Sequence, residues 1–378
     1  MEEESDHPIN IEILSKDEFI VSQFMTIQFH KINKNKPIKL YSIKTNELIV
    51  SLLIKDDQLI ASTSKGHIFI YKKEKNGKFI ENKKLSFSNN PIYFNLLDLE
   101  QKNLVCGFTL DNLDIINLEN SSIVSKLVFN NKKNYKKKKL DKSDDESSNK
   151  KNEENEEKEE EEENEMEEEF DRNTKPFLLK SSTNKNDLII FKQSFYLTMV
   201  DSKSLKIVKK IDLKKNNFSF QIFKPNEEKS FFYMIEFHKK NKDNLEVYKY
   251  NSDLTTINLF KTTIKPHFEE EDIDSEYDID YLDIEHDCLY RCIIKDVKNF
   301  SFIFKMRTGE TSQITGYFLY KVKNGKNNNK SRELSNISDN CEDEIEEMLE
   351  INQISDNKLI FAKGNYSDDI KEIKIINI

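Results

Sequence analysis

The chain of 378 residues contains no tryptophan and only seven glycines, six prolines and four cysteines. Four cysteines are too few for a disulfide framework at this length, which favours a reducing compartment. No apolar run approaches the roughly 20 residues needed to cross a bilayer. The N-terminal MEEESDHPIN has neither the basic nor the apolar region of a secretory signal. We therefore expect a soluble intracellular protein.

Motifs of the common enzyme classes are also missing. The glycines stand singly, so none forms a loop that could cradle a phosphate, and no Gly-x-Ser-x-Gly or His-Glu-x-x-His pattern occurs. The net charge of −10 argues against a surface that coats nucleic acid, because phosphate contacts need clustered lysine and arginine. The sequence therefore predicts a protein that is not an enzyme and needs no cofactor.

What the chain has in excess is charge, concentrated in one low-complexity insertion at residues 131–174. Thirteen of the eighteen residues from Glu153 to Phe170 are glutamate. Such a block of like charges cannot bury apolar area, so we expect a disordered or partly helical insertion. A second polar segment, residues 323–344, is expected to be a flexible loop.

The insertion opens with a basic run typical of nuclear-import signals or nucleic-acid patches. This run comprises Lys132, Lys133, Lys136, Lys137, Lys138 and Lys139. Ser143 precedes three acidic residues and resembles an acidic-directed kinase site, where phosphorylation would add about 1.5 to 2 negative charges. These features predict a protein of the nucleus, including the nucleolus. The alternatives are a cytoplasmic protein and a codon-biased loop without a partner.

The rest of the chain consists of short apolar runs of β-type composition in groups of four, repeated every roughly 40–50 residues. Three segments show the repeat best: QLIASTSKGHIFIYKKEKNGKFI, NLVCGFTLDNLDIINLENSSIV and DLIIFKQSFYLTMVDSKSLKIV. The unbroken runs HIFIY and LIIF predict middle strands covered on both faces. In KFIENKKLSF and SLKIVKKIDL apolar and polar residues alternate, which predicts outer strands that are more exposed to solvent.

This pattern resembles that of WD-repeat β-propellers. The resemblance implies an all-β fold, a single propeller of seven four-stranded blades formed by residues 8–130 and 175–378. Three blades precede the insertion and about four follow it. The family's Gly-His and Trp-Asp signatures are missing, and Gly66-His67 falls at the start of a third strand. The last group shows three clear strands, which leaves closure of the ring by an N-terminal strand open. A pair of β-sandwiches, or another β-repeat, is the alternative fold.

Three candidate sites remain, and each departs from its pattern. His286, Cys288 and Cys292 share one face of an expected strand, but zinc usually takes about four ligands, so we expect no metal there. A calcium loop is suggested by four acidic residues, although the required glycine and closing glutamate are replaced. These residues are Asp272, Asp274, Glu276 and Asp278. A hydrolase would need two carboxyl groups among Asp278, Asp280 and Asp283, one buried with a raised pKa and the other ionised. A solvated acidic run does not provide that difference.

The resemblance implies a non-catalytic protein-interaction scaffold, a subunit of a larger assembly that acts in ribosome assembly or RNA modification. Its partners would be other proteins of that complex, with RNA contacted only indirectly or weakly and with no membrane or small-molecule substrate. The alternatives are a cytoplasmic adaptor, such as a ubiquitin-ligase substrate receptor or a trafficking or cytoskeletal scaffold, and a propeller hydrolase.

Overall fold

A computed structural model of the protein describes residues 9–129 without a break and fifteen shorter segments beyond them. The segments are 175–181, 186–193, 196–212, 218–223, 230–238, 244–251, 255–263, 289–296, 299–308, 313–323, 326–327, 332–336, 347–355, 358–365 and 372–377. Every regular element in these residues is a β-strand, so the expected all-β class is confirmed.

The described strands form seven antiparallel sheets, and within a sheet each strand pairs with the next strand of the chain, except that β25 pairs with β23. Sheet 1 contains β1 (Asn10–Ile13), β2 (Glu18–Gln23), β3 (Thr26–Asn33) and β4 (Lys36–Lys44). Sheet 2 contains β5 (Ile49–Lys55), β6 (Gln58–Thr63), β7 (His67–Lys73) and β8 (Phe79–Ser86). Sheet 3 contains β9 (Asn95–Gln101), β10 (Leu104–Phe108), β11 (Asn112–Asn117) and β12 (Ser122–Val128).

Four further sheets follow residue 174. Sheet 4 contains β13 (Phe177–Leu179), β14 (Leu188–Gln193), β15 (Tyr196–Asp201) and β16 (Ile207–Asp212). Sheet 5 contains β17 (Phe218–Phe223), β18 (Phe231–His238), β19 (Asn244–Asn251) and β20 (Thr256–Thr263). Sheet 6 contains β21 (Leu289–Asp296), β22 (Asn299–Thr308), β23 (Gln313–Lys323), β24 (Lys326–Asn327) and β25 (Arg332–Asn336). Sheet 7 contains β26 (Glu347–Ser355), β27 (Lys358–Asn365) and β28 (Glu372–Asn377).

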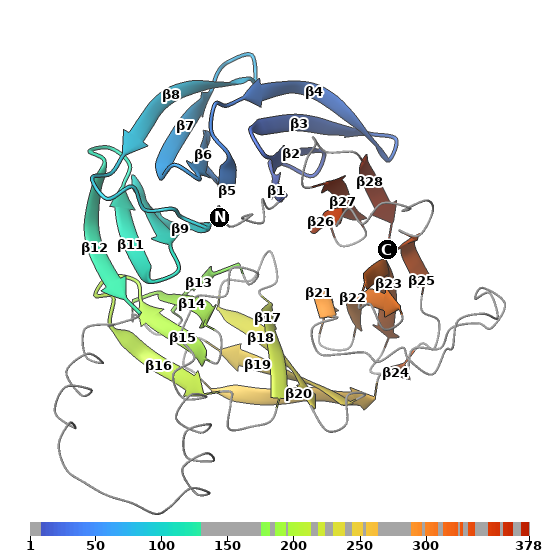
Figure 1. The fold of residues 1–378 in the computed structure, drawn as a ribbon. Coiled ribbons are helices and arrows are strands. Elements are labelled where there is room, and N and C mark those ends of the chain that lie inside the picture. The colour runs from blue at the N-terminus through green and yellow to red at the C-terminus, as the bar shows by residue number, and fades with distance from the viewer. Residues whose placement is uncertain are drawn as a thin grey trace, which may run out of the picture.

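The sheets follow one another around a central axis, with the first strand of each sheet near the axis and the fourth strands of sheets 1 to 5 at the rim (Figure 1). Apolar side chains fill the space between neighbouring sheets. One cluster joins Phe29 of sheet 1 to Tyr71 of sheet 2, and others join sheets 2 and 3, 3 and 4, and 4 and 5. Another joins Phe19 of sheet 1 to Ile360 of sheet 7, so the two ends of the chain meet.

Two details of the topology concern the closure of the ring, which the sequence pattern left open, and residues 323–344. β1 pairs with β2 inside sheet 1, so among the described residues sheets 1 and 7 meet by side-chain packing rather than by a shared strand. β24 and β25 lie inside residues 323–344, which were expected to form a loop. Both pair with β23, so this part of the segment is strand.

The burial pattern of the strands is the expected one. In β7 and β14 four consecutive residues are buried, because neighbouring sheets cover both faces. The fourth strands β4 and β12 have no buried residue.

A β-bulge recurs at the same place in five sheets, where the third strand pairs with the fourth. In sheet 1, Phe29 pairs with Tyr41 and His30 with Lys39, which leaves Leu40 as an extra residue. Val124 and Val208 are the extra residues of β12 and β16. These three side chains are 50–58 % exposed, which the bulge explains because the extra residue is pushed out of the ladder.

Candidate functional site: the turn face of sheets 1 to 3

Connecting segments from three sheets meet at one end of the strands. We call this surface the turn face and define it as residues 24–25, 45–49, 63–67 and 87–94. The backbone N–H of Thr45 donates to the carbonyl of Met25 at 2.7 Å, and the N–H of Ser64 donates to that of Leu48 at 2.9 Å. The connection between sheets 1 and 2 is thereby bonded to the β2–β3 turn of sheet 1 and to the β6–β7 turn of sheet 2.

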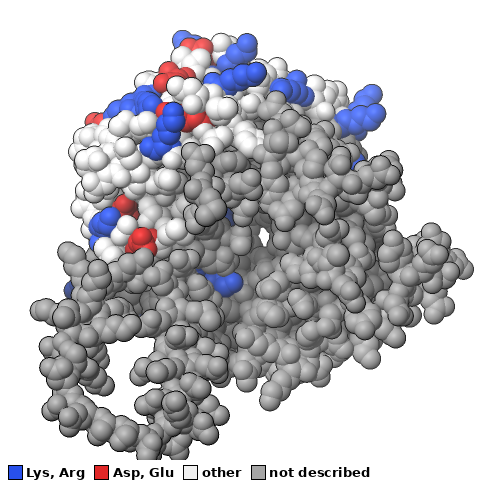
Figure 2. Space-filling view, viewed as in Figure 1, with Lys and Arg blue, Asp and Glu red and all other residues white. Residues whose placement is uncertain are grey.

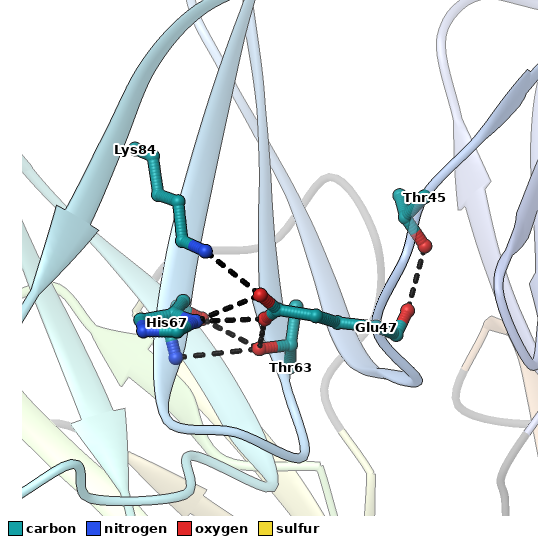
Figure 3. Close-up of polar contacts among 5 residues, drawn as sticks. All are labelled: Thr45, Glu47, Thr63, His67 and Lys84. Carbon is teal, nitrogen blue, oxygen red and sulfur yellow. Dashed lines mark hydrogen bonds and ion pairs between the residues drawn. The ribbon is translucent and has the colours of Figure 1, made fainter.

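The turn face contains the buried carboxylate of Glu47, which Thr63, His67 and Lys84 surround (Figure 3). Its side chain is 2 % exposed. Thr63 Oγ1 donates to Oε2 at 2.7 Å, Lys84 Nζ donates to Oε1 at 2.7 Å, and His67 Nδ1 lies 2.8 Å from Oε2. Glu47 precedes β5, Thr63 ends β6, His67 begins β7 and Lys84 lies in β8, so one carboxylate ties all four strands of sheet 2 together.

The charge of Glu47 follows from these partners. Burial by itself would raise the pKa of the carboxyl group, but hydrogen bonds from Lys84, Thr63 and His67 outweigh it and lower the pKa from 4.5 to about 2. The carboxylate is therefore ionised at neutral pH, with three polar partners around it. It has no proton to donate, so its role is to hold the strands in place rather than to act as a general acid.

A second buried carboxylate lies in sheet 3. Asp114 is fully buried and accepts a hydrogen bond from Tyr93 Oη at 3.1 Å, and Lys126 Nζ lies 3.9 Å from its other oxygen. Burial raises the pKa of Asp114, and this effect is larger than the opposing effects of Lys126 and Tyr93. Tyr93 comes from the turn face, so this contact anchors the segment between sheets 2 and 3.

Lysines occupy equivalent places in the fourth strands of three consecutive sheets. Lys84, Lys126 and Lys210 pair in register with Phe69, Asp114 and Thr198, residues of the third strands. Lys84 Nζ lies 5.0 Å from the centre of the Phe69 ring, and Lys210 Nζ lies 3.9 Å from that of Tyr196. Such ammonium–ring contacts are favourable. A repeated lysine therefore connects the rim of each of these three sheets to its third strand.

No family model matches this sequence, and no curated protein matches it. Solved structures do match. The β-propeller domain of Cps50 (Swd1) from Myceliophteria thermophila is 10% identical, with 99% of this chain and 98% of that chain covered and a TM-score of 0.52. KlHsv2 with its loop 6CD replaced by a Gly-Ser linker is 9% identical, with 95% and 90% covered and a TM-score of 0.50.

The fold is a β-propeller. This confirms the resemblance to WD-repeat propellers at the level of the fold. Identities of 9% and 10% carry no activity or partner from those proteins to this chain.

Gly66-His67, which stands at an unusual place for a WD-repeat signature, lies where β6 turns into β7. Gly66 has a φ of +75°, and a Cβ at this position would lie 2.4 Å from the carbonyl oxygen of Asn90. Only glycine fits, and the tight turn places His67 beside Glu47. The Trp-Asp signature of the family is missing from this chain. In sheet 2 a network of glutamate, threonine, histidine and lysine ties the strands together instead.

The turn face also carries exposed apolar side chains. Met25 is 45 % exposed and Ile92 is 36 % exposed, and the turn face also contains the exposed polar residues Asn46 and Lys65. Exposed apolar groups within a polar rim are typical of protein–protein contact surfaces. Sequence reasoning missed this surface because nothing in the runs themselves shows which turns come together.

None of the candidate metal, nuclear-import or phosphorylation residues belongs to the turn face. His286, Cys288, the basic run Lys132 to Lys139, Ser143 and the acidic residues 272–283 fall outside the described residues. Cys292 lies in β21 with its side chain undescribed. Within the described part of the chain, no three His, Cys, Asp or Glu residues are grouped so that they could hold a metal ion. No helix of that part is long and apolar enough to span a membrane.

Proposed function

We propose that this propeller is a non-catalytic docking platform, a subunit of a larger assembly that binds protein partners through its turn face. The observation that carries the proposal is the Glu47 network, which ties the connecting segments to four strands. Segments already held in place lose little conformational entropy on binding, so contacts made by Met25 and Ile92 would translate efficiently into affinity.

The basic run supports a nuclear place for this platform, in ribosome assembly or an RNA-modifying complex. Lys132 to Lys139 provide the clustered positive charge that import receptors recognise. A fluorescent fusion of the full chain should concentrate in the nucleus, and deletion of residues 132–140 should release it to the cytoplasm. Cytoplasmic fluorescence from both fusions would refute the nuclear part and favour a cytoplasmic adaptor.

Docking through the turn face is tested by affinity purification and mass spectrometry of the tagged full chain. The double variant M25D/I92D should lose the proteins that the wild type retains, because two charges would be placed in the apolar contact. Ile80→Asp is the matched control, since Ile80 is 48 % exposed but lies in β8 at the rim. Equal recovery of partners by wild type and M25D/I92D would refute docking at this face.

A further inference from the structure

The β7–β8 hairpin of sheet 2 turns through Asn76 and Gly77. Gly77 has a φ of +82°, and no atom outside the adjoining residues lies within 4 Å of the place where a Cβ would stand. An Asn-Gly pair is typical of tight hairpin turns, because glycine adopts positive φ without strain. Both residues are exposed, so water reaches the side-chain amide of Asn76 and the backbone of Gly77.

The side chain of Asn76 is oriented by two hydrogen bonds within this turn. The backbone N–H of Lys78 donates to Asn76 Oδ1 at 2.8 Å, and Asn76 Nδ2 donates to Glu74 Oε2 at 3.2 Å. The first bond closes an Asx turn, in which the side-chain carbonyl takes the place of a backbone carbonyl. The ring that it closes includes the backbone nitrogen of Gly77. The amide carbon Cγ of Asn76 is therefore held on the same side of the turn as that nitrogen.

A backbone nitrogen held beside a side-chain amide is a nucleophile in an intramolecular reaction, and asparagine is one of the thermolabile residues. The nitrogen of Gly77 loses its proton and forms a bond to Cγ of Asn76. The bond from Cγ to Nδ2 then breaks, and Nδ2 leaves with that proton as ammonia. Water opens the resulting succinimide at one of its two carbonyl groups, which gives aspartate or isoaspartate.

The surroundings of the turn favour this reaction. The N–H of Lys78 donates to the oxygen that becomes negative when Cγ is attacked, as a donor of an oxyanion hole does. Residues 72–78 contain four lysines and one glutamate, and lysine and arginine side chains gather along the rim that carries β4 and β8 (Figure 2). Nearby positive charge favours the anionic form of an attacking nitrogen.

One contact opposes the attack. The N–H of Gly77 donates to the carbonyl of Glu74 at 2.9 Å, and this bond must break before the nitrogen reaches Cγ. In an exposed turn the net cost of breaking a hydrogen bond is small, because water replaces the lost partner. Local opening of the hairpin end is therefore sufficient for the reaction.

We propose that Asn76-Gly77 is a site of spontaneous covalent modification, at which a succinimide closed by Gly77 converts Asn76 to isoaspartate and aspartate. The new carboxylate would replace the Nδ2 donor beside Glu74 and repel it. Isoaspartate also lengthens the backbone of a turn that the bond from Glu74 N–H to the carbonyl of Lys78, at 2.8 Å, holds closed.

The consequence extends to the packing of two sheets. Phe79 follows the turn, is 4 % exposed and donates its N–H to Tyr41 Oη of sheet 1 at 3.0 Å. The inference is independent of the docking role, because β7 runs from His67 on the turn face to Lys73. The β7–β8 turn therefore lies at the other end of the strands.

Incubation of the full chain in mildly alkaline buffer, followed by mass spectrometry of its chymotryptic peptides, tests the proposal. Each converted residue gains about 1 Da, because a hydroxyl or its oxyanion replaces the amide nitrogen. Asn120 is the internal control, since it lies in the β11–β12 turn and its Oδ1 accepts the backbone N–H of Ser122 at 3.2 Å. Asn76 should convert at least about tenfold faster than Asn120, because Ser121 carries a Cβ that Gly77 lacks.

Two variants separate the reaction at this site from other changes. Asn76→Gln should show no conversion, since its longer side chain closes a larger and less favourable ring. Gly77→Ala should slow the conversion by about tenfold or more, because the added Cβ crowds the attacking nitrogen. Electron-transfer fragmentation should identify isoaspartate as well as aspartate at position 76 in the wild type.

Equal rates at Asn76 and Asn120, or a product that contains aspartate without isoaspartate, would overturn the proposal. The free peptide KKEKNGKF, residues 72–79, supplies the reference rate without the fold. Conversion in the full chain that is more than about tenfold slower than in this peptide would show that the hairpin protects the site, and would also overturn the proposal.

Discussion

Replacement of Glu47 by glutamine tests whether one buried carboxylate stabilises sheet 2. The substitution keeps the shape of the side chain but removes its charge, so Lys84 and His67 lose their anionic partner. The shift of the Glu47 pKa from 4.5 to about 2 corresponds to about 3 kcal/mol at roughly 1.4 kcal/mol per pKa unit. Lys84 is 35 % exposed, and solvent screens its share, so we expect a loss of about 2 kcal/mol at pH 7.

The pH dependence gives the sharper test. A carboxyl group whose pKa is lower in the folded state stabilises the protein above its unfolded pKa, and this contribution disappears as the pH falls toward the folded pKa. For Glu47 the window runs from about pH 4.5 down to about pH 2. The difference in unfolding free energy between wild type and E47Q should therefore be constant near neutrality and fall by more than half at about pH 3.

Urea unfolding followed by far-UV circular dichroism is the suitable assay, because the chain has no tryptophan to report by fluorescence. Glu81→Gln serves as the control, since Glu81 is exposed in the same sheet and its loss should cost less than about 0.5 kcal/mol. A difference between wild type and E47Q that is below about 0.5 kcal/mol at pH 7, or that does not change with pH, would refute the reasoning.

Two further predictions concern backbone fit and a buried histidine. Gly66→Ala should lower the unfolding free energy by clearly more than Gly77→Ala. Both glycines have a positive φ, but only at Gly66 would the added Cβ lie 2.4 Å from a backbone oxygen. Gly77→Ala should cost about 1 kcal/mol, and equal losses of the two variants in urea unfolding would contradict the prediction. Burial, and then the charge of Lys39, lowers the pKa of His30 from 6.5 to about 4. Stability should therefore fall as the pH drops from about 6.5 to about 4, where the unfolded chain binds a proton that the folded chain excludes. His30→Gln should reduce this loss, and an unchanged slope of unfolding free energy against pH would count against it.

Local sequence predicted the strands well because their signal is local. The runs EFIVSQ, HIFIYKK and FSFQIF coincide with β2, β7 and β17, since β-branched and aromatic residues between polar turns favour extended chain. The contrast between buried middle strands and wet outer strands was also readable, because it depends only on which residues alternate.

The side-chain contacts of the candidate site could not be predicted from the sequence. His67 was recognised as part of a dipeptide but not as a partner of Glu47, which lies twenty residues earlier. Leu40, Val124 and Val208 look like ordinary strand residues in the sequence, and their exposure follows from bulges that only strand pairing creates. The three-strand pattern of the last group was visible, yet the N-terminal strand β1 pairs within its own sheet.

The sequence by itself determined that this chain makes repeated short strands, where most of them lie and which would be covered on both faces, because hydrophobic pattern acts over a few neighbouring residues. Only the tertiary structure decided which turns share a surface and which carboxylates become buried with partners. Those properties depend on pairs such as Gly66 with Asn90 and Ile32 with Ile373, which are brought together by packing between sheet edges and loops far apart in the chain.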